Sequence, residues 1–284
     1  MPGFILINKP VGPTSHDIVD RVRHMTGVKT VGHAGTLDPF ASGLLIVGVG
    51  REATREFVKL VGLDKRYRAT LHLGATSDTD DRTGRITNGP WTMDHGPIQK
   101  TLRDSENGTW SMVRGLYPPL VQPTKETIEQ TLKQFTGKIQ QLPPIYSAKK
   151  IKGKKMYELA RAGLPVARSP SPVEIYSIEI VDHLPQATSH LLTLDIHCSS
   201  GTYIRALARD IGETLPAQGG SASGGGCGAY LEELERTAIG PFNLDEAVKA
   251  DGLNAGNWEK HLISPNQALD RCQRQGGVLG WKQS

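Results

Sequence analysis

The stretch GHAGTLDPFASGLLIVGV, residues 32–49, joins a loop with a single acidic side chain to a continuous apolar run. The apolar run, residues 44–49, predicts a strand that is buried on both faces. Asp38 stands before Pro39, and proline keeps the preceding residue out of the α region, so we expect Asp38 in an extended or turn conformation. A carboxylate on such a fixed loop suits a catalytic group. The alternative is an ordinary Asp-Pro turn whose carboxylate accepts nearby backbone N–H groups.

The composition is that of a globular protein. The chain has 284 residues, 37% of them hydrophobic and 22% charged, which suits one large domain or two small ones. Its net charge of +4 is compatible with nucleic acid but does not establish it. Three widely separated cysteines argue against a disulfide framework or a cysteine zinc site and fit a reducing cytosol. The N-terminal apolar stretch is too short for a signal peptide, and no run reaches the ~20 apolar residues of a membrane span, so we expect a cytoplasmic protein.

Strands and helices alternate without a strict βαβ order, which favours an α+β fold. Strands are predicted at 4–8, 44–49, 65–73, 173–181 and 191–198, and further regular structure at 231–239. Helices are predicted after Thr14 or Ser15 up to Gly27, across 51–61, after Thr124 up to Gly137, and after Tyr203. Residues 74–84 read as a polar loop, 91–122 as an irregular insertion and 218–226 as a glycine-rich insertion.

Three side chains near predicted strand ends or helix starts are candidates for chemistry: Asp38, Tyr67 and Arg205. Arg205 lies in the first turn of a largely apolar helix. Its side chain either extends along that surface to solvent or pairs with a buried carboxylate, for which the planar guanidinium is better suited than lysine.

The chain resembles the TruB family of pseudouridine synthases. Seven blocks carry the resemblance, in family order and spread over most of the chain. They are NKP at 8–10 with GPTS at 12–15, GHAGTLDPFASG at 32–43, KRYR at 65–68, SDTDD at 77–81, PPIYSAKK at 143–150, CSSGTYIR at 198–205 and LERT at 234–237. The resemblance implies the pseudouridine synthase fold, a mixed, mostly antiparallel central sheet flanked by helices with an active-site cleft across it.

Members of this family convert uridine to pseudouridine at position 55 in the T-loop of tRNA, so the resemblance implies that activity. By the same resemblance, Asp38 is the nucleophile, acting on the ribose or on the base, and Arg205 holds it as an anion. Tyr67 stacks on the flipped uracil and is also a candidate for taking the C5 proton, although phenol is a weak base at neutral pH. No cofactor or metal is implied, since the reaction is a redox-neutral isomerisation.

The remaining implied contacts concern the RNA. His33 matches the histidine that fills the space left by the flipped base, and Leu234 an apolar residue of the pocket. Lys9 supports the Asp38 loop, and Lys149 and Lys150 belong to a basic stretch that we expect to bind phosphates with salt-dependent affinity. The implied partner is the tRNA T-stem-loop, with no membrane contact and no obligate protein partner.

We expect residues 1–250 to form the catalytic domain and residues 251–284 a tail too short for the C-terminal RNA-binding (PUA) domain of many members. Three alternatives stay open: a nucleoside glycosylase that passes the ribose to water, a non-catalytic RNA-binding protein, and a guide-RNA-dependent synthase. Release of free uracil, inactivity on a T-stem-loop and dependence on a guide RNA would identify them in turn.

Overall fold

A long mixed sheet forms the centre of the computed structural model, which describes residues 1–88, 101–103, 110–112, 123–146, 150–151, 154–156, 168–183, 190–216 and 226–274. In spatial order the strands are β16 (Val248–Lys249), β1 (Gly3–Lys9), β3 (Ser42–Val49), β14 (Ala229–Ile239), β4 (Lys65–Leu73), β13 (Leu191–Cys198), β12 (Ser171–His183) and β9 (Gly137–Gln141). Strands β2 (Val31–His33) and β15 (Phe242–Asn243) pair with β3 and β14. Only the β1–β16 and β3–β14 pairings are parallel in this described sheet, which confirms the mixed, mostly antiparallel architecture.

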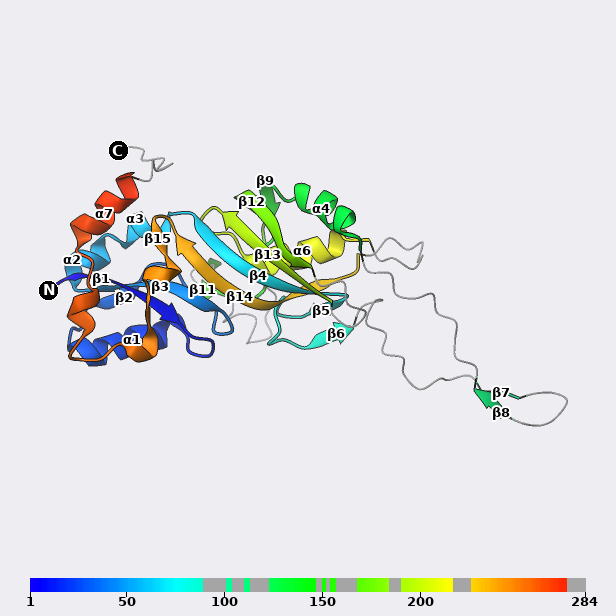
Figure 1. Ribbon diagram of the computed structural model, residues 1–284, viewed down its shortest axis with the longest axis horizontal. Helices are drawn as coiled ribbons and strands as arrows, with labels where there is room; N and C mark the ends of the chain where they lie inside the picture. The colour runs from blue at the N-terminus through cyan, green and yellow to red at the C-terminus, as the bar shows by residue number, and fades with distance from the viewer. Residues whose placement is uncertain are drawn as a thin grey trace.

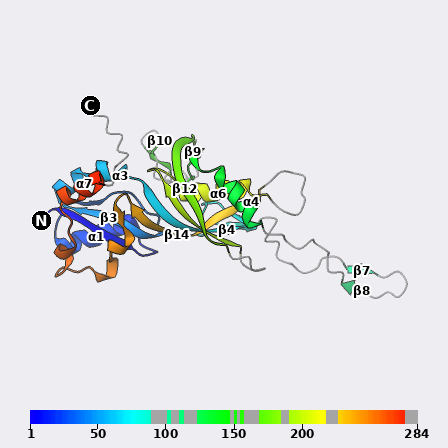
Figure 2. The ribbon, with the colours of Figure 1, turned by 45° about the horizontal axis from the view of Figure 1, so that its top comes forward.

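Helices cover both ends of this sheet. They are α1 (Ser15–Thr26), α2 (Arg51–Arg55), α3 (Phe57–Val61), α4 (Lys125–Lys133), α6 (Ile204–Thr214) and α7 (Pro265–Arg274), with 3₁₀ turns η1 (Leu244–Glu246), η2 (Ala250–Gly252) and η3 (Trp258–His261). Figures 1 and 2 show α1, α3 and α7 around β1 and β3 at one end, and α4 and α6 beside β9 and β12 at the other. None of the helices in the described ranges is long and apolar enough to cross a membrane.

The strand predicted at 44–49 is buried on both faces, as expected. Leu44 and Ile46 of β3 pack in one apolar cluster, with residues of α2, α3 and α7, whereas Leu45 and Val47 pack in another with residues of α1. Side chains alternate along a strand, so neighbouring apolar residues reach different clusters. The Asp38 loop therefore leads directly into one of the most buried strands of the protein.

Strand β4 confirms the predicted alternation. Tyr67, Ala69 and Leu71 enter the third apolar cluster together with residues of α4 and α6, while Arg68 on the opposite face is exposed. Helix α6 packs across this face of β4 and β14. The helix that carries Arg205 and the strand that carries Tyr67 therefore share one core.

Helix α1 begins and ends as predicted. The Thr14 hydroxyl accepts a hydrogen bond from the Asp17 N–H at 3.1 Å, and the Asp17 carboxylate accepts one from the Thr14 N–H at 2.8 Å, a reciprocal capping box. Gly27 ends the helix at φ +69°. Such a cap fixes the point at which the loop before α1 reaches the Asp38 loop.

Three sequence expectations need correction. The helix predicted across 51–61 is two short helices that meet at Glu56. The loop predicted at 74–84 contains β5 (Ala75–Ser77), which pairs with β6 (Ile86–Asn88), because polar threonines and serines also suit a short exposed strand. Gly137 does not end the helix that follows Thr124, since α4 ends at Lys133 and Gly137, at φ +92°, begins β9.

The two predicted insertions lie largely outside the described residues. Within 91–122, strands β7 (Thr101–Arg103) and β8 (Trp110–Met112) pair with each other. Of 218–226, only Gly226 is described. Two further short strands, β10 (Lys150–Ile151) and β11 (Lys154–Lys155), form a separate ladder.

The described part of the expected tail packs against the first strand. The N–H groups of Phe4 and Ile263 each donate to the other residue's carbonyl at 2.8 Å. Trp258 packs in the apolar cluster that contains Leu45, Val47 and residues of α1. Ala268 and Cys272, both in α7, pack in the cluster that contains Leu44 and Ile46. All three cysteines of the chain are free and buried.

Candidate active site

The loop that carries Asp38 connects β2 to β3 and is held through its backbone. The Ser15 hydroxyl accepts a hydrogen bond from the Leu37 N–H at 2.9 Å and donates to the Leu37 carbonyl at 3.0 Å. The Gly12 N–H donates to the Pro39 carbonyl at 2.8 Å. Leu37 is thus bonded to the first residue of α1, and Pro39 is bonded to the segment before α1. The Asp38 side chain itself keeps 36% exposure, so it remains accessible.

Lys9 lies beneath this loop and is fully buried. Its ammonium donates to the carbonyls of Pro10 at 2.8 Å and Pro13 at 2.9 Å, with a longer contact of 3.5 Å to the Pro39 carbonyl. Burial lowers the pKa of Lys9 to about 8, and the nearby Asp38 carboxylate opposes this shift. Its contacts suit the loop support expected of Lys9.

Arg205 meets Asp38 from the first turn of α6. Its Nε lies 2.9 Å from Asp38 Oδ2 and its Nη2 lies 3.4 Å from Asp38 Oδ1. The same guanidinium donates to the Thr79 carbonyl at 3.0 Å and the Tyr146 carbonyl at 2.9 Å, and lies 3.5 Å from an Asp81 oxygen. Of the two readings of Arg205 left open by the sequence, pairing with a carboxylate is the one observed, and its side chain is only 7% exposed.

Asp81 has an anchoring role that sequence reasoning did not assign. One of its carboxylate oxygens accepts from the Thr79 hydroxyl at 2.9 Å and from the N–H and hydroxyl of Thr83 at 2.9 and 2.5 Å. Beside it, Asp80 accepts from Arg209 at 3.0 Å, and burial raises the pKa of Asp80. The SDTDD block therefore holds α6 and Arg205 in addition to the contact that Arg205 makes with Asp38.

Tyr67 is buried next to the Asp38 loop. It belongs to the same apolar cluster as Leu37 and Phe40, which flank Asp38, and as Leu234 of β14. Leu234 is paired in register with Ala69 of β4. Burial raises the pKa of Tyr67, so its phenol keeps its proton at neutral pH.

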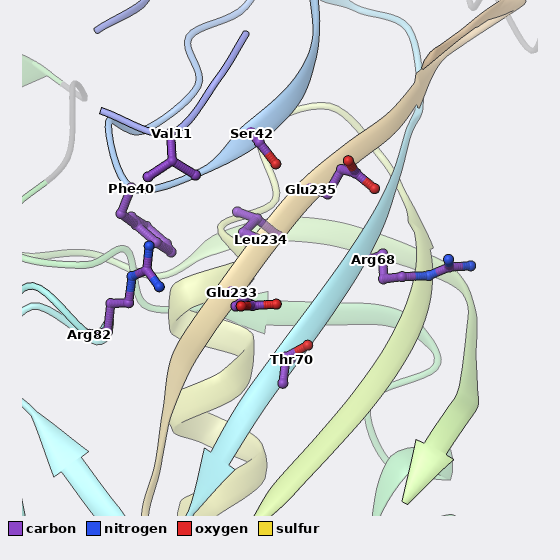
Figure 3. Close-up of a pocket in the computed structure, with 9 residues that line it drawn as sticks. All are labelled: Val11, Phe40, Ser42, Arg68, Thr70, Arg82, Glu233, Leu234 and Glu235. Atoms are coloured by element: carbon purple, nitrogen blue, oxygen red, sulfur yellow. The ribbon is translucent and has the colours of Figure 1, made fainter. Parts of the chain in front are cut away.

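A cavity of about 270 Å³ opens beside the loop, at the residues of β3 and β14 that lead up to their short parallel pairing. Figure 3 shows Val11, Phe40 and Arg82 on one side of β14, with Arg68 and Thr70 on β4 beyond it. The full lining consists of Val11, Phe40, Ser42, Arg68, Thr70, Arg82, Glu233, Leu234 and Glu235. Asp38, Tyr67 and Arg205 do not line it, but Phe40 and Leu234 belong to both the cavity wall and the cluster around Tyr67.

The other predicted contacts are less closely joined to Asp38. His33 is the last residue of β2, where burial and the Arg236 charge lower its pKa, and no hydrogen bond among the described residues joins it to Asp38. Lys149 lies outside the described residues, and so does the side chain of Lys150, whose backbone belongs to β10. No group of three metal-ligating side chains occurs in the portion of the chain that is described.

Comparison with known proteins identifies the class. The profile of the family described as "TruB family pseudouridylate synthase (N terminal domain)" matches residues 23–112 and 98–204, together more than half of the chain. The chain therefore belongs to the TruB family of pseudouridylate synthases.

Curated relatives and solved structures agree with this family. The "tRNA pseudouridine synthase B" of Geobacter sulfurreducens is 42% identical over 95% of this chain and 76% of its own length. The protein of the same name from Caldanaerobacter subterraneus subsp. tengcongensis is 40% identical over 94% of this chain and 81% of its own. A chain of the "Crystal Structure of a Cbf5-Nop10-Gar1 Complex" superposes with a TM-score of 0.61 at 24% identity, over 95% of this chain. The present chain spans 62% of that larger one, and the likeness confirms the predicted fold.

Proposed function

We propose that this protein converts uridine to pseudouridine in tRNA and that Asp38 is its nucleophile. Relatives that align with more than nine tenths of the chain at about 40% identity are named tRNA pseudouridine synthase B. The observation that supports the role of Asp38 best is its pairing with Arg205 through two guanidinium nitrogens, on a loop held by its backbone on both sides of the carboxylate.

The reaction breaks the N1–C1′ bond of uridine, turns the uracil, forms a C5–C1′ bond and replaces the C5 proton by one on N1. A nucleophilic carboxylate must be charged and correctly aimed. Arg205 supplies both requirements, because its fork stabilises the anion and its bonds to Thr79, Tyr146 and Asp81 keep the fork from following Asp38 outward. Asp38 then needs no rearrangement of its own to meet the ribose or the base.

Uridine in a folded loop of RNA must leave its stack before Asp38 can reach it. Base flipping costs a few kcal/mol, and stacking on an aromatic ring returns roughly 1–3 kcal/mol. We assign the ring contact to Tyr67, with Leu234 as the apolar wall at the cavity, and the space left in the RNA to His33. Burial raises the pKa of the Tyr67 phenol and makes it a weak base for the C5 proton, so we propose stacking as its main role.

We further propose that the substrate site is the T-loop uridine at position 55, that the protein acts alone and in the cytoplasm, and that it uses no cofactor. Residues 1–250 would supply the catalytic domain, with 251–274 packed against β1. Lys149 and Lys150 would bind the phosphates of the T-stem-loop.

The test is single-turnover conversion of an unmodified T-stem-loop RNA labelled with tritium at uridine C5. The label enters water when C5 bonds to C1′, and pseudouridine is located by carbodiimide labelling. We expect the wild type to release the label from one uridine of the RNA. We expect Asp38→Asn to bind the RNA but to release no label. Asp251→Asn is the matched control, because Asp251 also pairs with an arginine, Arg21, and neither residue lines the cavity.

The alternatives give different results in the same assay. A glycosylase would release free uracil, whereas an isomerase leaves the mass of the RNA unchanged. A non-catalytic RNA-binding protein would bind the wild-type stem-loop without tritium release, and a guide-dependent synthase would need a second RNA. Turnover by Asp38→Asn at the rate of Asp251→Asn would refute the assignment of the nucleophile.

A further inference from the structure

We propose that Arg236 is a positioning residue for the reaction, fixing the Asp38 loop by bonding its backbone on both sides of the carboxylate; this rests on the proposed role of Asp38. The Nη2 and Nη1 atoms of Arg236 donate to the carbonyls of Gly35 and Thr36, each at 3.2 Å. Its Nε donates to the carbonyl of Leu44 at 2.8 Å. Gly35 and Thr36 precede Asp38 and Leu44 follows it, so one planar group connects the two arms of the loop.

The burial of Arg236 makes this connection strong. The side chain belongs to β14 and is 1% exposed, and it donates to three backbone carbonyls and is also a side-chain hydrogen-bond partner of Tyr67. A buried cation is stable only while such acceptors surround it. Any movement that withdraws the loop carbonyls therefore leaves the charge without solvation, which penalises loop conformations other than the observed one.

Arg236 also stands between the two candidate site groups. It is paired in register with Gly43 of β3 on one side and with Tyr67 of β4 on the other. A Cβ at Gly43 would lie 2.6 Å from the Arg236 nitrogen, so the strand after the Asp38 loop passes directly over the Arg236 backbone. A register shift follows Arg236 in β14, the kind of irregularity that redirects side chains beside functional sites. The residue thus sets the loop relative to Tyr67 as well as the loop itself.

Lysine cannot replace Arg236 in this role. The three carbonyls are served by three different nitrogens of a planar fork, whereas the three N–H groups of an ammonium all radiate from one nitrogen on a flexible stem. Arg236→Lys keeps the charge and most of the volume but cannot connect both arms of the loop. The variant therefore separates the loss of the contacts that position the loop from the loss of the positive charge.

The matched control is Lys65→Met. Lys65 is another buried cation of the sheet, and its ammonium donates to the carbonyls of Val61 and Leu63, at 2.6 and 2.5 Å, and to the Ser200 hydroxyl at 3.1 Å. These acceptors lie outside the Asp38 loop. Lys65→Met therefore removes a comparable buried cation without freeing the loop.

The experiment compares wild type, Arg236→Lys and Lys65→Met in three measurements: midpoint of thermal unfolding, Kd for the T-stem-loop RNA and single-turnover rate at saturating RNA. For Arg236→Lys we expect a rate 10- to 100-fold below wild type with Kd within about threefold. For Lys65→Met we expect an equal or larger loss of midpoint with a rate within about threefold. An Arg236→Lys rate within threefold of wild type, or equal rate losses in both variants at equal midpoints, would overturn the inference.

Amide hydrogen exchange of the peptide spanning residues 34–41 tests the same claim without turnover. We expect faster exchange there in Arg236→Lys and wild-type exchange in Lys65→Met. Unchanged exchange in Arg236→Lys would refute the inference even in an active enzyme. If wild-type protein converts no uridine while exchange responds as expected, the proposed function fails and the loop contact stands.

Discussion

Replacing Ser15 with alanine should weaken catalysis without removing any group that touches the substrate. Ser15 is the first residue of α1 and is almost fully buried. Its hydroxyl makes both hydrogen bonds to the backbone of Leu37, the residue immediately before Asp38. Alanine keeps the helix start but offers Leu37 neither a donor nor an acceptor.

The size of the effect follows from those two bonds. Each neutral hydrogen bond contributes about 0.5–1.5 kcal/mol, and a buried N–H left without an acceptor costs about 1–3 kcal/mol. The substitution therefore destabilises the observed loop conformation by about 2–3 kcal/mol. This cost falls on the loop and not on the helix, because Thr14 still caps α1 through Asp17. Since about 1.4 kcal/mol corresponds to a factor of ten, we expect a single-turnover rate roughly 30- to 150-fold below wild type.

Thr14→Ala is the control for this prediction. It removes the cap of the same helix, at a typical cost of about 1 kcal/mol, but the hydrogen bonds of the Thr14 side chain within the described residues go to Asp17 and not to the loop. Both variants are compared by thermal unfolding and by tritium release at saturating RNA. If Ser15→Ala loses no more rate than Thr14→Ala, the loop is positioned by something other than Ser15 and the reasoning fails.

Two further variants test the charges around Asp38. Arg205→Lys should lower the single-turnover rate by about 100-fold or more, because an ammonium donates from one nitrogen and cannot reproduce the two-point pairing with Asp38 that the guanidinium makes while its other N–H groups hold the carbonyls of Thr79 and Tyr146; a loss below threefold in the same assay would contradict the pairing. Lys9 has a folded-state pKa of about 8 against 10.5 for an unperturbed lysine, so between these pH values the unfolded state binds more protons and stability rises with pH. Lys9→Met should reduce this rise, measured by denaturant unfolding at pH 7.5 and 9.5, and Lys65, whose pKa burial also lowers to about 8, should preserve part of it. An unchanged rise in Lys9→Met would show that Lys9 is not the buried group responsible.

The elements around the site follow from local pattern. The continuous apolar run of β3, the alternation of β4 and the Thr14–Gly27 limits of α1 each reflect one physical requirement that a short window contains. Asp38 stands out for the same reason, since the proline after it restricts its backbone. These parts of the fold could be predicted because neighbours in sequence decide them.

The partners of the site could not be predicted in this way. Arg205 meets Asp38 across 167 residues of sequence, and Arg236 meets Thr36 across 200. Arg236 occupies one position in a strand rich in glutamate, where charge alone suggests an exposed face. Its burial follows from the parallel pairing of β14 with β3, which no local periodicity encodes. Family resemblance indicated the blocks that matter but assigned no role to Arg236 or Asp81.

The composition of the Asp38 loop and of the proline-rich segment before α1 that contacts it explains why buried cations lie beneath them. Proline and glycine restrict or shape the backbone here, but proline has no N–H, so a segment rich in proline has more carbonyls than donors. An apolar core beneath it would leave those carbonyls unsatisfied. Lys9 and Arg236 supply the missing donors from below, through the carbonyls of Pro10, Pro13, Gly35, Thr36 and Leu44. Of these two charges, that of Lys9 also lies near the accessible carboxylate of Asp38, so a side chain that holds the loop also attracts the group that the proposed reaction uses.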